Sequence, residues 1–403
     1  MTKITNIAGK FILLLLLTVS VKLIGASADT VDRQPRFLKS LLLTYEYGKV
    51  LHTHSFVKGD NPEGLYYNFF QAFSVKYGIN TDGRQAWQQL YGYPVWGFGV
   101  FKGYLVDDNG MLGSPTAFYA FFQAPFKRWN KWSLNYEIDI GFAVNWNRHD
   151  IFENGYDYPI GTYGTAYFAF STGTVFEIDK QLDLSTSIGF THFSNGAIEL
   201  PNLGINLFSS KIGLQYHFKE RTRFIKSEIP KYIKETEWLV YLAPAVKQIA
   251  FTEVDDADSI LFVQAFSYPV ITLSTTINRQ LSNMIKIGIG FDLTYNGTHG
   301  ASMEVVRGVP EKTDNLPFAD HILIGIYPAF ELVAGNLSMI VQPGFYVVRK
   351  EVGENEIPAS YQKIGMKYQI TKHLFVGANI RAYSFKKADF IEWVMGYRLK
   401  WQD

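Results

Sequence analysis

Residues 191–218 read THFSNGAIELPNLGINLFSSKIGLQYHF, and this stretch decides the fold. It contains two alternating segments joined by a loop rich in Gly, Pro and Asn, a pattern that predicts two antiparallel strands. Successive side chains of a strand point to opposite faces. One face of the pair is apolar and carries the even-numbered residues Leu182, Leu184, Ile188, Phe190, Phe208, Ile212, Leu214, Tyr216 and Phe218. The other face is polar and carries Asp183, Ser185, Ser187, Lys211, Gln215 and His217.

Three polar residues share the apolar face: His192, Ser194 and Asn206. A residue two positions along a strand lies about 6.6 Å away on the same face, and a neighbouring strand lies about 4.8 Å away. His192 can therefore reach the Ser194 hydroxyl, and Asn206 can lie behind the imidazole. This is the arrangement of nucleophile, general base and orienting residue used in acyl transfer. Asn195 and the backbone N–H of Gly196 are candidate oxyanion donors.

The amino terminus has the pattern of a secretory signal. Two lysines precede the apolar run FILLLLLTVSV, and Ala26-Ser27-Ala28 forms a small-residue cleavage site, so we expect residues 1–28 to be removed on export. The chain has no cysteine, which excludes a lipoprotein anchor, disulfides and thiol chemistry. Its net charge of +1 gives no support for nucleic-acid binding. No clustered ligands indicate a metal, and we expect no cofactor.

The mature chain has the composition of a membrane barrel. Aromatic residues make up 16% of the full chain, as suits strands with aromatic girdles. Strand-like segments number about eight before residue 219 and about eight after residue 236, an even total as in bacterial barrels. No mature segment approaches the roughly 20 apolar residues of a spanning helix. We therefore predict an all-β fold, an antiparallel transmembrane β-barrel of the bacterial outer membrane.

The chain divides into two halves of similar pattern. Residues 29–218 form the first and 237–403 the second, with a basic connector at 219–236 between them. Short turns alternate with longer connections, as in barrels with short periplasmic turns and long outer loops. The loop after Ser194 then faces outward. Periodicity leaves open one barrel of about 16 strands or two of about eight; we expect one, because a second closed barrel would need its own insertion step.

From His192 to Asn206 the chain has the pattern H-x-S-N, a short loop, then P-N-x-G-I and a polar residue. Here it resembles the PagL-type lipid A 3-O-deacylases, also called acyloxyacyl-hydrolase-like outer-membrane barrels. The resemblance is specific over 189–218, covers the first half less specifically, and does not obviously extend beyond residue 236. It implies that His192 is the general base, Ser194 the nucleophile and Asn195 an oxyanion residue. It also implies lipid A of lipopolysaccharide, among outer-membrane lipids, as the substrate.

Asn206 departs from this family, which has a glutamate at that position. A neutral amide can still hold the imidazole tautomer, as in the Cys-His-Asn enzymes, but it adds no charge to stabilise the imidazolium. Glu199 is the nearest acidic candidate, in the loop. Two function classes follow: a serine esterase that removes an ester-linked acyl chain from lipid A, or a non-catalytic porin-like or lipid-binding barrel. The sequence indicates neither the acyl position cleaved nor the oligomeric state.

Overall fold

The computed structural model describes residues 38–106, 110–148, 159–221, 224–226, 228–229, 231–254, 260–307, 309–314, 316–350, 357–384 and 387–402. The predicted signal at 1–28 lies outside these residues.

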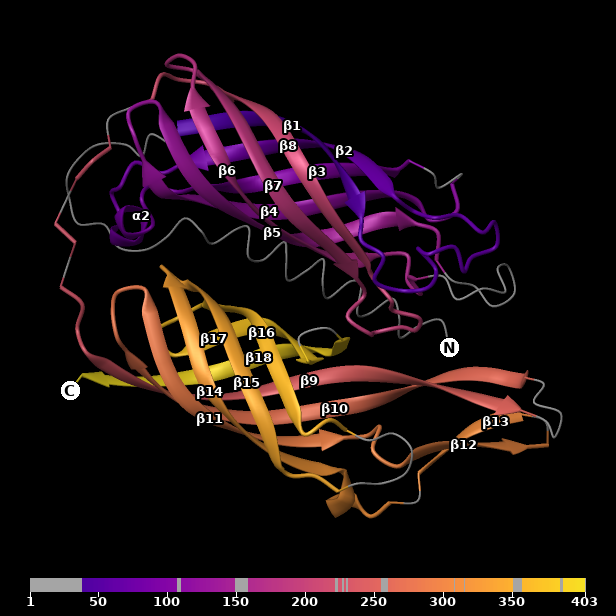
Figure 1. Ribbon diagram of the computed structural model, residues 1–403. Helices are drawn as coiled ribbons and strands as arrows, with labels where there is room; N and C mark the ends of the chain where they lie inside the picture. The colour runs from indigo at the N-terminus through magenta and orange to yellow at the C-terminus, as the bar shows by residue number, and fades with distance from the viewer. Residues whose placement is uncertain are drawn as a thin grey trace. The chain divides into compact units, whose positions relative to one another are not determined.

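Eight antiparallel strands close the first barrel (Figure 1). They are β1 (Leu38–Val50), β2 (Phe69–Asn80), β3 (Val95–Leu105), β4 (Gly113–Arg128), β5 (Trp132–Trp146), β6 (Thr165–Glu177), β7 (Leu182–Ser194) and β8 (Ile205–His217). The short helix α2 (Ala86–Leu90) lies in the connection between β2 and β3. All eight strands were expected from the sequence, with ends that differ by a few residues.

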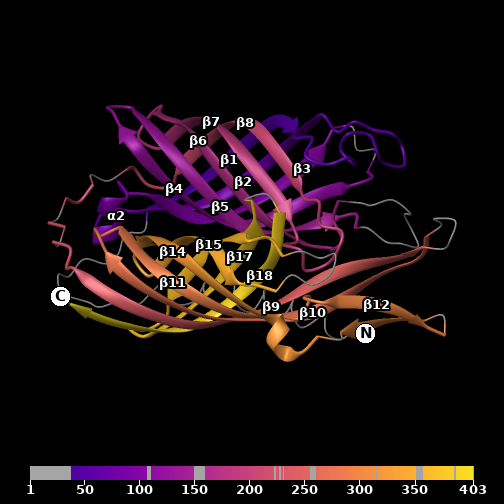
Figure 2. The ribbon, with the colours of Figure 1, turned by 60° about the horizontal axis from the view of Figure 1, so that its bottom comes forward.

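Eight further strands close a second barrel. They are β9 (Glu235–Val254), β10 (Ile260–Gln280), β11 (Ile285–Asn296), β14 (Ile322–Ala334), β15 (Leu337–Val348), β16 (Ser360–Gln369), β17 (Leu374–Tyr383) and β18 (Lys387–Gln402). The longest, β9 and β10, have 20 and 21 residues and run past the ends of the other strands (Figure 2). The connection from β11 to β14 forms a hairpin, β12 (Ala301–Val306) and β13 (Val309–Asp314), followed by the 3-10 helix η1 (Phe318–His321).

The expectation of one barrel of about 16 strands is wrong, and the alternative of two eight-stranded barrels is correct. β8 pairs with β7 on one side and with β1 on the other, where Leu41 lies opposite Tyr216. β9 pairs with β10 on one side and with β18 on the other, where Tyr241 lies opposite Gly396. Each set of eight therefore satisfies its own edge hydrogen bonds, and no edge is left to join the halves. Eight strands also enclose an interior that side chains can fill.

The predicted faces of β7 and β8 are confirmed. Ile188 and Leu214 are each 49% exposed on the outer wall, whereas Gln215 is 6% exposed and points inward. The interior of this barrel carries ion pairs, with Lys76 Nζ 2.5 Å from Glu137 Oε1 and Lys211 Nζ 3.3 Å from Glu46 Oε2. Large aromatic side chains fill the rest of it, among them Phe101, Tyr119, Tyr167 and Phe193. An apolar wall around a polar interior is typical of outer-membrane barrels.

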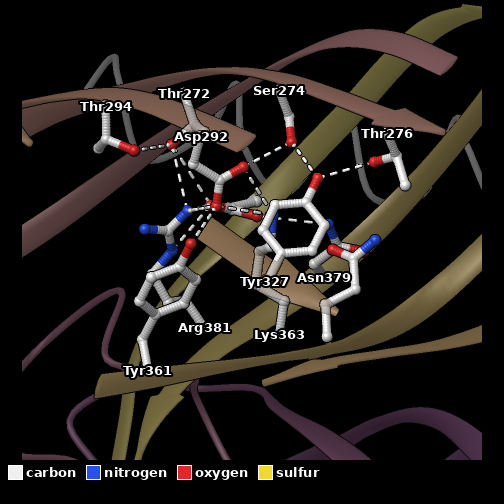
Figure 3. A network of polar contacts seen from close by, with 12 residues as sticks. Thr272, Ser274, Thr276, Asp292, Thr294, Tyr327, Tyr361, Lys363, Asn379 and Arg381 are labelled. Atoms are coloured by element: carbon white, nitrogen blue, oxygen red, sulfur yellow. Dashed lines mark hydrogen bonds and ion pairs between the residues drawn. The ribbon is translucent and has the colours of Figure 1, made fainter. Parts of the chain in front are cut away.

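A denser polar network fills the second barrel (Figure 3). Asp292 lies at its centre and accepts from Lys363 at 2.8 Å and from the Tyr361 hydroxyl at 2.7 Å. Arg381 bridges Asp292 and Glu392, at 3.3 and 2.7 Å. All four charged side chains are 0% exposed. This packed, ion-paired interior is unlike the open water-filled lumen of a porin.

The connections of the first barrel separate into two kinds. Residues 129–131 and 178–181 form short turns at the end where the β2–β3 connection carries α2, whereas 51–68 and 195–204 are longer loops at the opposite end. The 195–204 loop follows Ser194, so the end of β7 lies among the long loops. Among the described residues, no helix is long and apolar enough to cross a membrane.

Candidate active site

The strand register places His192 directly opposite Asn206. Nδ1 of His192 lies 2.7 Å from Oδ1 of Asn206. An amide oxygen can only accept, so Nδ1 is the donor. In the neutral imidazole, Nε2 then carries the lone pair and is free to take a proton. The pairing expected from strand spacing is present.

Ser194 is the last residue of β7, two residues beyond His192 and of the same strand parity, and its side chain is 7% exposed. Gly204, the residue directly before β8, packs against both. It has a φ of +69°, and a Cβ there would lie 3.2 Å from Cε1 of His192, 3.6 Å from Cβ of Ser194 and 2.9 Å from the carbonyl oxygen of Phe193. Both the left-handed backbone and the close approach require glycine. Because Gly204 has no side chain, the loop can lie close beside the imidazole.

The segment that follows β1 lies against the site. Asn206 Nδ2 donates to Oγ1 of Thr53 at 3.0 Å, and the backbone N–H of Leu51 donates to the carbonyl of Asn206 at 2.8 Å. Nε2 of His54 lies 2.9 Å from the carbonyl oxygen of Gly204 and must be its donor. Sequence reasoning missed these residues, because only the pairing of β1 with β8 brings them close.

His54 is held as a neutral donor in this segment. Burial lowers the pKa of its imidazole below the ordinary 6.5, and nearby Lys58 acts in the same direction, while the Gly204 carbonyl opposes them. Among the described residues, its buried Nδ1 has no hydrogen-bond partner. Protonation would place an unpaired N–H in this position, so the packing of residues 51–54 favours the neutral form.

Asn195 mainly organises the 195–204 loop. Its Nδ2 donates to the carbonyl of Glu199 at 2.6 Å, its Oδ1 accepts from the backbone of Ala197 at 3.0 Å, and its own N–H donates to Oδ1 of Asn202 at 2.9 Å. Gly196 and Ala197 have φ of 64° and 59°. The backbone N–H of Gly196 has no hydrogen-bond partner in the described part of the chain. Of the two candidate oxyanion residues, Asn195 already uses its N–H and amide in the loop, whereas the N–H of Gly196 remains available.

Asn206, and not Glu199, accepts the hydrogen bond from His192 Nδ1. The backbone carbonyl of Glu199 accepts from Asn195 within the loop. Within the described ranges, no group of three His, Asp or Glu side chains is arranged to hold a metal ion.

An apolar surface adjoins these polar residues on the outer wall. Phe168 on β6 lies opposite His192 and is 38% exposed. Phe208 is 47% exposed, and Ile188 on β7 continues the same face. A hydrocarbon chain in the surrounding membrane can lie along this wall with its polar end at His192 and Ser194.

The two barrels match two family models. Residues 71–221 match Lipid A 3-O-deacylase (PagL), and residues 236–401 match Acyloxyacyl hydrolase, C-terminal domain. Residues 71–221 thus carry a PagL-type lipid A 3-O-deacylase domain, of a family of ester hydrolases, and this match confirms the resemblance inferred from residues 192–206. The view that the resemblance does not extend beyond residue 236 was wrong, because the second barrel is itself a domain of the acyloxyacyl hydrolases.

The PagL match does not cover the whole of the first barrel. It begins within β2, so β7 and β8 with His192, Ser194 and Asn206 lie inside it. Thr53 and His54 lie before it.

Other comparisons add little to the PagL assignment. No curated protein matches the chain. Similar solved structures include a Pseudomonas aeruginosa FadL homologue (9% identity, 90% of this chain and 89% of that one, TM-score 0.21) and a mutant of the TodX monoaromatic hydrocarbon channel (8%, 92% and 91%, 0.19). A mutant Rh. blastica porin also matches (8%, 90% and 99%, 0.17). At these TM-scores nothing about this chain follows from them.

Proposed function

We propose that the first barrel is a serine esterase that hydrolyses an ester-linked acyl chain of lipid A. The observation that carries the proposal is the 2.7 Å hydrogen bond from His192 Nδ1 to Asn206, with Ser194 two residues along the same strand face. The PagL match supports lipid A as the substrate class. The bacterial outer membrane is the proposed location, reached through the signal at 1–28.

The reaction would proceed in two steps. Ser194 Oγ attacks the ester carbonyl while His192 Nε2 takes its proton, and the backbone N–H of Gly196, with Asn195, stabilises the oxyanion. Collapse breaks the ester bond, and His192 gives the proton to the departing sugar oxygen. Water, activated by His192, then attacks the acyl-enzyme and releases the fatty acid, which restores the Ser194 hydroxyl.

The position of the site suits a membrane-bound substrate. The polar residues lie at the end of β7 among the long loops, and exposed Phe208 and Ile188 lie along the wall beside them. Acyl chains would remain in the hydrocarbon layer while the ester reaches Ser194. A porin-like function is not favoured, because ion-paired and aromatic side chains fill the interior of each barrel.

The direct test is mass spectrometry of lipid A from cells that express the protein or its Ser194→Ala variant. The wild type should produce lipid A lighter by one acyl chain, and the variant should leave it intact. Identical lipid A in both cultures, with both proteins inserted, would contradict the proposal and favour a non-catalytic lipid-binding barrel.

A further inference from the structure

The connector at 219–236 joins the two barrels at the ends that carry their short turns. In the first barrel this end has the turns 129–131 and 178–181, and in the second it has 281–284 and 370–373. Short turns of outer-membrane barrels lie on the periplasmic side. Irregular backbone does not lie in the hydrocarbon layer, because its polar groups would have no partners there. The connector therefore runs along the membrane surface or extends beyond it into water.

Exposed aromatic side chains flank the connector on both sides. Tyr216 and Phe218 directly precede it, and Trp238 on β9 directly follows it. Trp401 on β18 lies opposite Thr236 and is also exposed. Tyrosine and tryptophan concentrate at the level of the lipid headgroups. Both ends of the connector therefore lie at the headgroup level.

The middle of the connector is held against the first barrel. The ring of Phe224 stacks on Tyr93, with centroids 4.2 Å apart, and the guanidinium of Arg128 lies 4.9 Å from the Phe224 centroid. The backbone N–H of Ile225 donates to the carbonyl of Asp82 at 2.9 Å. These contacts fix residues 224–225 at the connection between β2 and β3. The residues that follow them thus begin beside the end of a membrane barrel.

The basic-apolar segment, residues 226–234, follows this contact. It carries three lysines and one glutamate. Ile229, Tyr232 and Ile233 are exposed, Ile233 to 54%. Lys231 and Lys234 are exposed beside them. Within the described part of this segment, no side chain forms an ion pair and no backbone group forms a hydrogen bond with another described residue.

A membrane surface provides partners for both kinds of side chain. Isoleucine and tyrosine can enter the boundary between headgroups and hydrocarbon, where lysine stems also pack while their amines reach the phosphates. Anionic headgroups attract basic segments that lie next to membrane spans. In water, the three apolar side chains would remain hydrated and the lysines unpaired.

We propose that the basic-apolar segment binds the anionic phospholipid headgroups of the membrane on the periplasmic side. The segment lies at the end of the first barrel opposite the loop that follows Ser194, and the inference does not rest on the proposed esterase reaction. Binding would hold the link between the two barrels on the leaflet that faces the short turns.

The test measures the depth of the segment in the full-length protein. The chain has no cysteine, so Ile233→Cys carries a nitroxide spin label at one position. Electron paramagnetic resonance is recorded in lipid nanodiscs of zwitterionic phosphatidylcholine, with or without anionic phosphatidylglycerol. In the anionic discs, collisions with lipid-soluble oxygen should exceed those with a water-soluble nickel chelate. In the zwitterionic discs this ratio should reverse.

The lysines should determine this difference. Joint substitution of Lys226, Lys231 and Lys234 by Gln should shift the label in anionic discs from oxygen access to nickel access. Salt at about 1 M should do the same, because the screening length falls to about 3 Å. Lys131→Cys, labelled in the short turn between β4 and β5, is the control, and its accessibility should not respond to the three substitutions.

Three results would overturn the proposal. Nickel access in both kinds of disc would place the segment in water. Protection from both reagents would place it against protein. Equal oxygen access in the two lipid mixtures, unchanged by the lysine substitutions, would exclude anionic headgroups as the group that is bound.

Discussion

The side-chain oxygen of Asn206 accepts a hydrogen bond of 2.7 Å from Nδ1 of His192, across two directly opposed positions of β7 and β8. A carboxylate in that place would both orient the imidazole and stabilise its protonated form. The amide provides orientation alone. The chain therefore separates two contributions that are combined in a triad with an acidic third member.

Substitutions at Asn206 should resolve these contributions. Asn206→Ala should lower deacylation by a large factor, up to roughly 10⁴-fold, because the imidazole loses its fixed tautomer. Asn206→Glu should retain or raise activity if the carboxylate remains ionised at the membrane surface. Initial rates on purified lipopolysaccharide measure both. If Asn206→Ala acts as fast as the wild type, Asn206 has no catalytic role, and Glu199→Gln becomes the next variant to assay.

The nucleophile and the base should act as one unit. We expect Ser194→Ala and His192→Ala each to remove nearly all deacylation while the barrel still inserts. The double variant should be little slower than either single variant, because each loss already disables the same step. Kinetics on the three proteins, with heat-modifiable gel mobility as the control for folding, provide the measurement. Strictly multiplicative losses would argue against a joint role.

Residue parity predicts the labelling of introduced cysteines. Cysteines at Ile188 or Leu214 should react with lipid-soluble reagents and resist aqueous ones, since both positions are exposed on the outer wall. A cysteine at Gln215 should react slowly with both, because this side chain is buried in a filled interior. Mass shifts after labelling in vesicles report the result. Aqueous labelling of Leu214→Cys would place the catalytic face in the lumen.

The network of the second barrel should contribute strongly to stability. Lys363 and Asp292 lie 2.8 Å apart and are both fully buried, so Lys363→Met should cost about 3–5 kcal/mol of unfolding free energy by leaving Asp292 undercompensated. Lys400→Met, which removes an exposed pair with Glu235, should cost about 0–1 kcal/mol. Urea titrations in micelles compare the two. Equal midpoints would mean that Arg381 alone compensates Asp292.

Acid should loosen the segment after β1. The pKa of His54 is lowered in the folded protein, so its stabilising effect is present above the ordinary 6.5 and decreases as pH falls through the lowered value. Hydrogen exchange of residues 51–54, corrected for the intrinsic rate, should increase between pH 7.5 and 5.5. His54→Gln can still donate to Gly204 and should flatten this dependence. The same slope in both proteins would exclude His54 as the titrating group.

The long connection between β11 and β14 shows one limit of prediction from local pattern. Residues 301–314 lie in one of the longer connections of the sequence and include Gly308 and Pro310. The structure has the hairpin of β12 and β13, in which Met303 pairs with Lys312. β12 alternates apolar Ala301, Met303 and Val305 with polar Ser302 and Glu304, whereas β13 does not alternate. Only one of the two paired segments therefore has a local strand pattern.

Alternation along each strand is a local property. The sequence by itself therefore determined the strands of both barrels and the common strand face of His192, Ser194 and Asn206. It also determined that these three residues lie close together across one hairpin. Closure is decided by partners far apart in the chain. A strand's sequence records which face is apolar, but its backbone hydrogen bonds are the same whichever neighbour accepts them. Only the tertiary structure therefore decided that β8 pairs with β1 and β9 with β18, which gives two barrels. The same closure brings Thr53 to Asn206, a contact between residues 153 positions apart that no local pattern encodes.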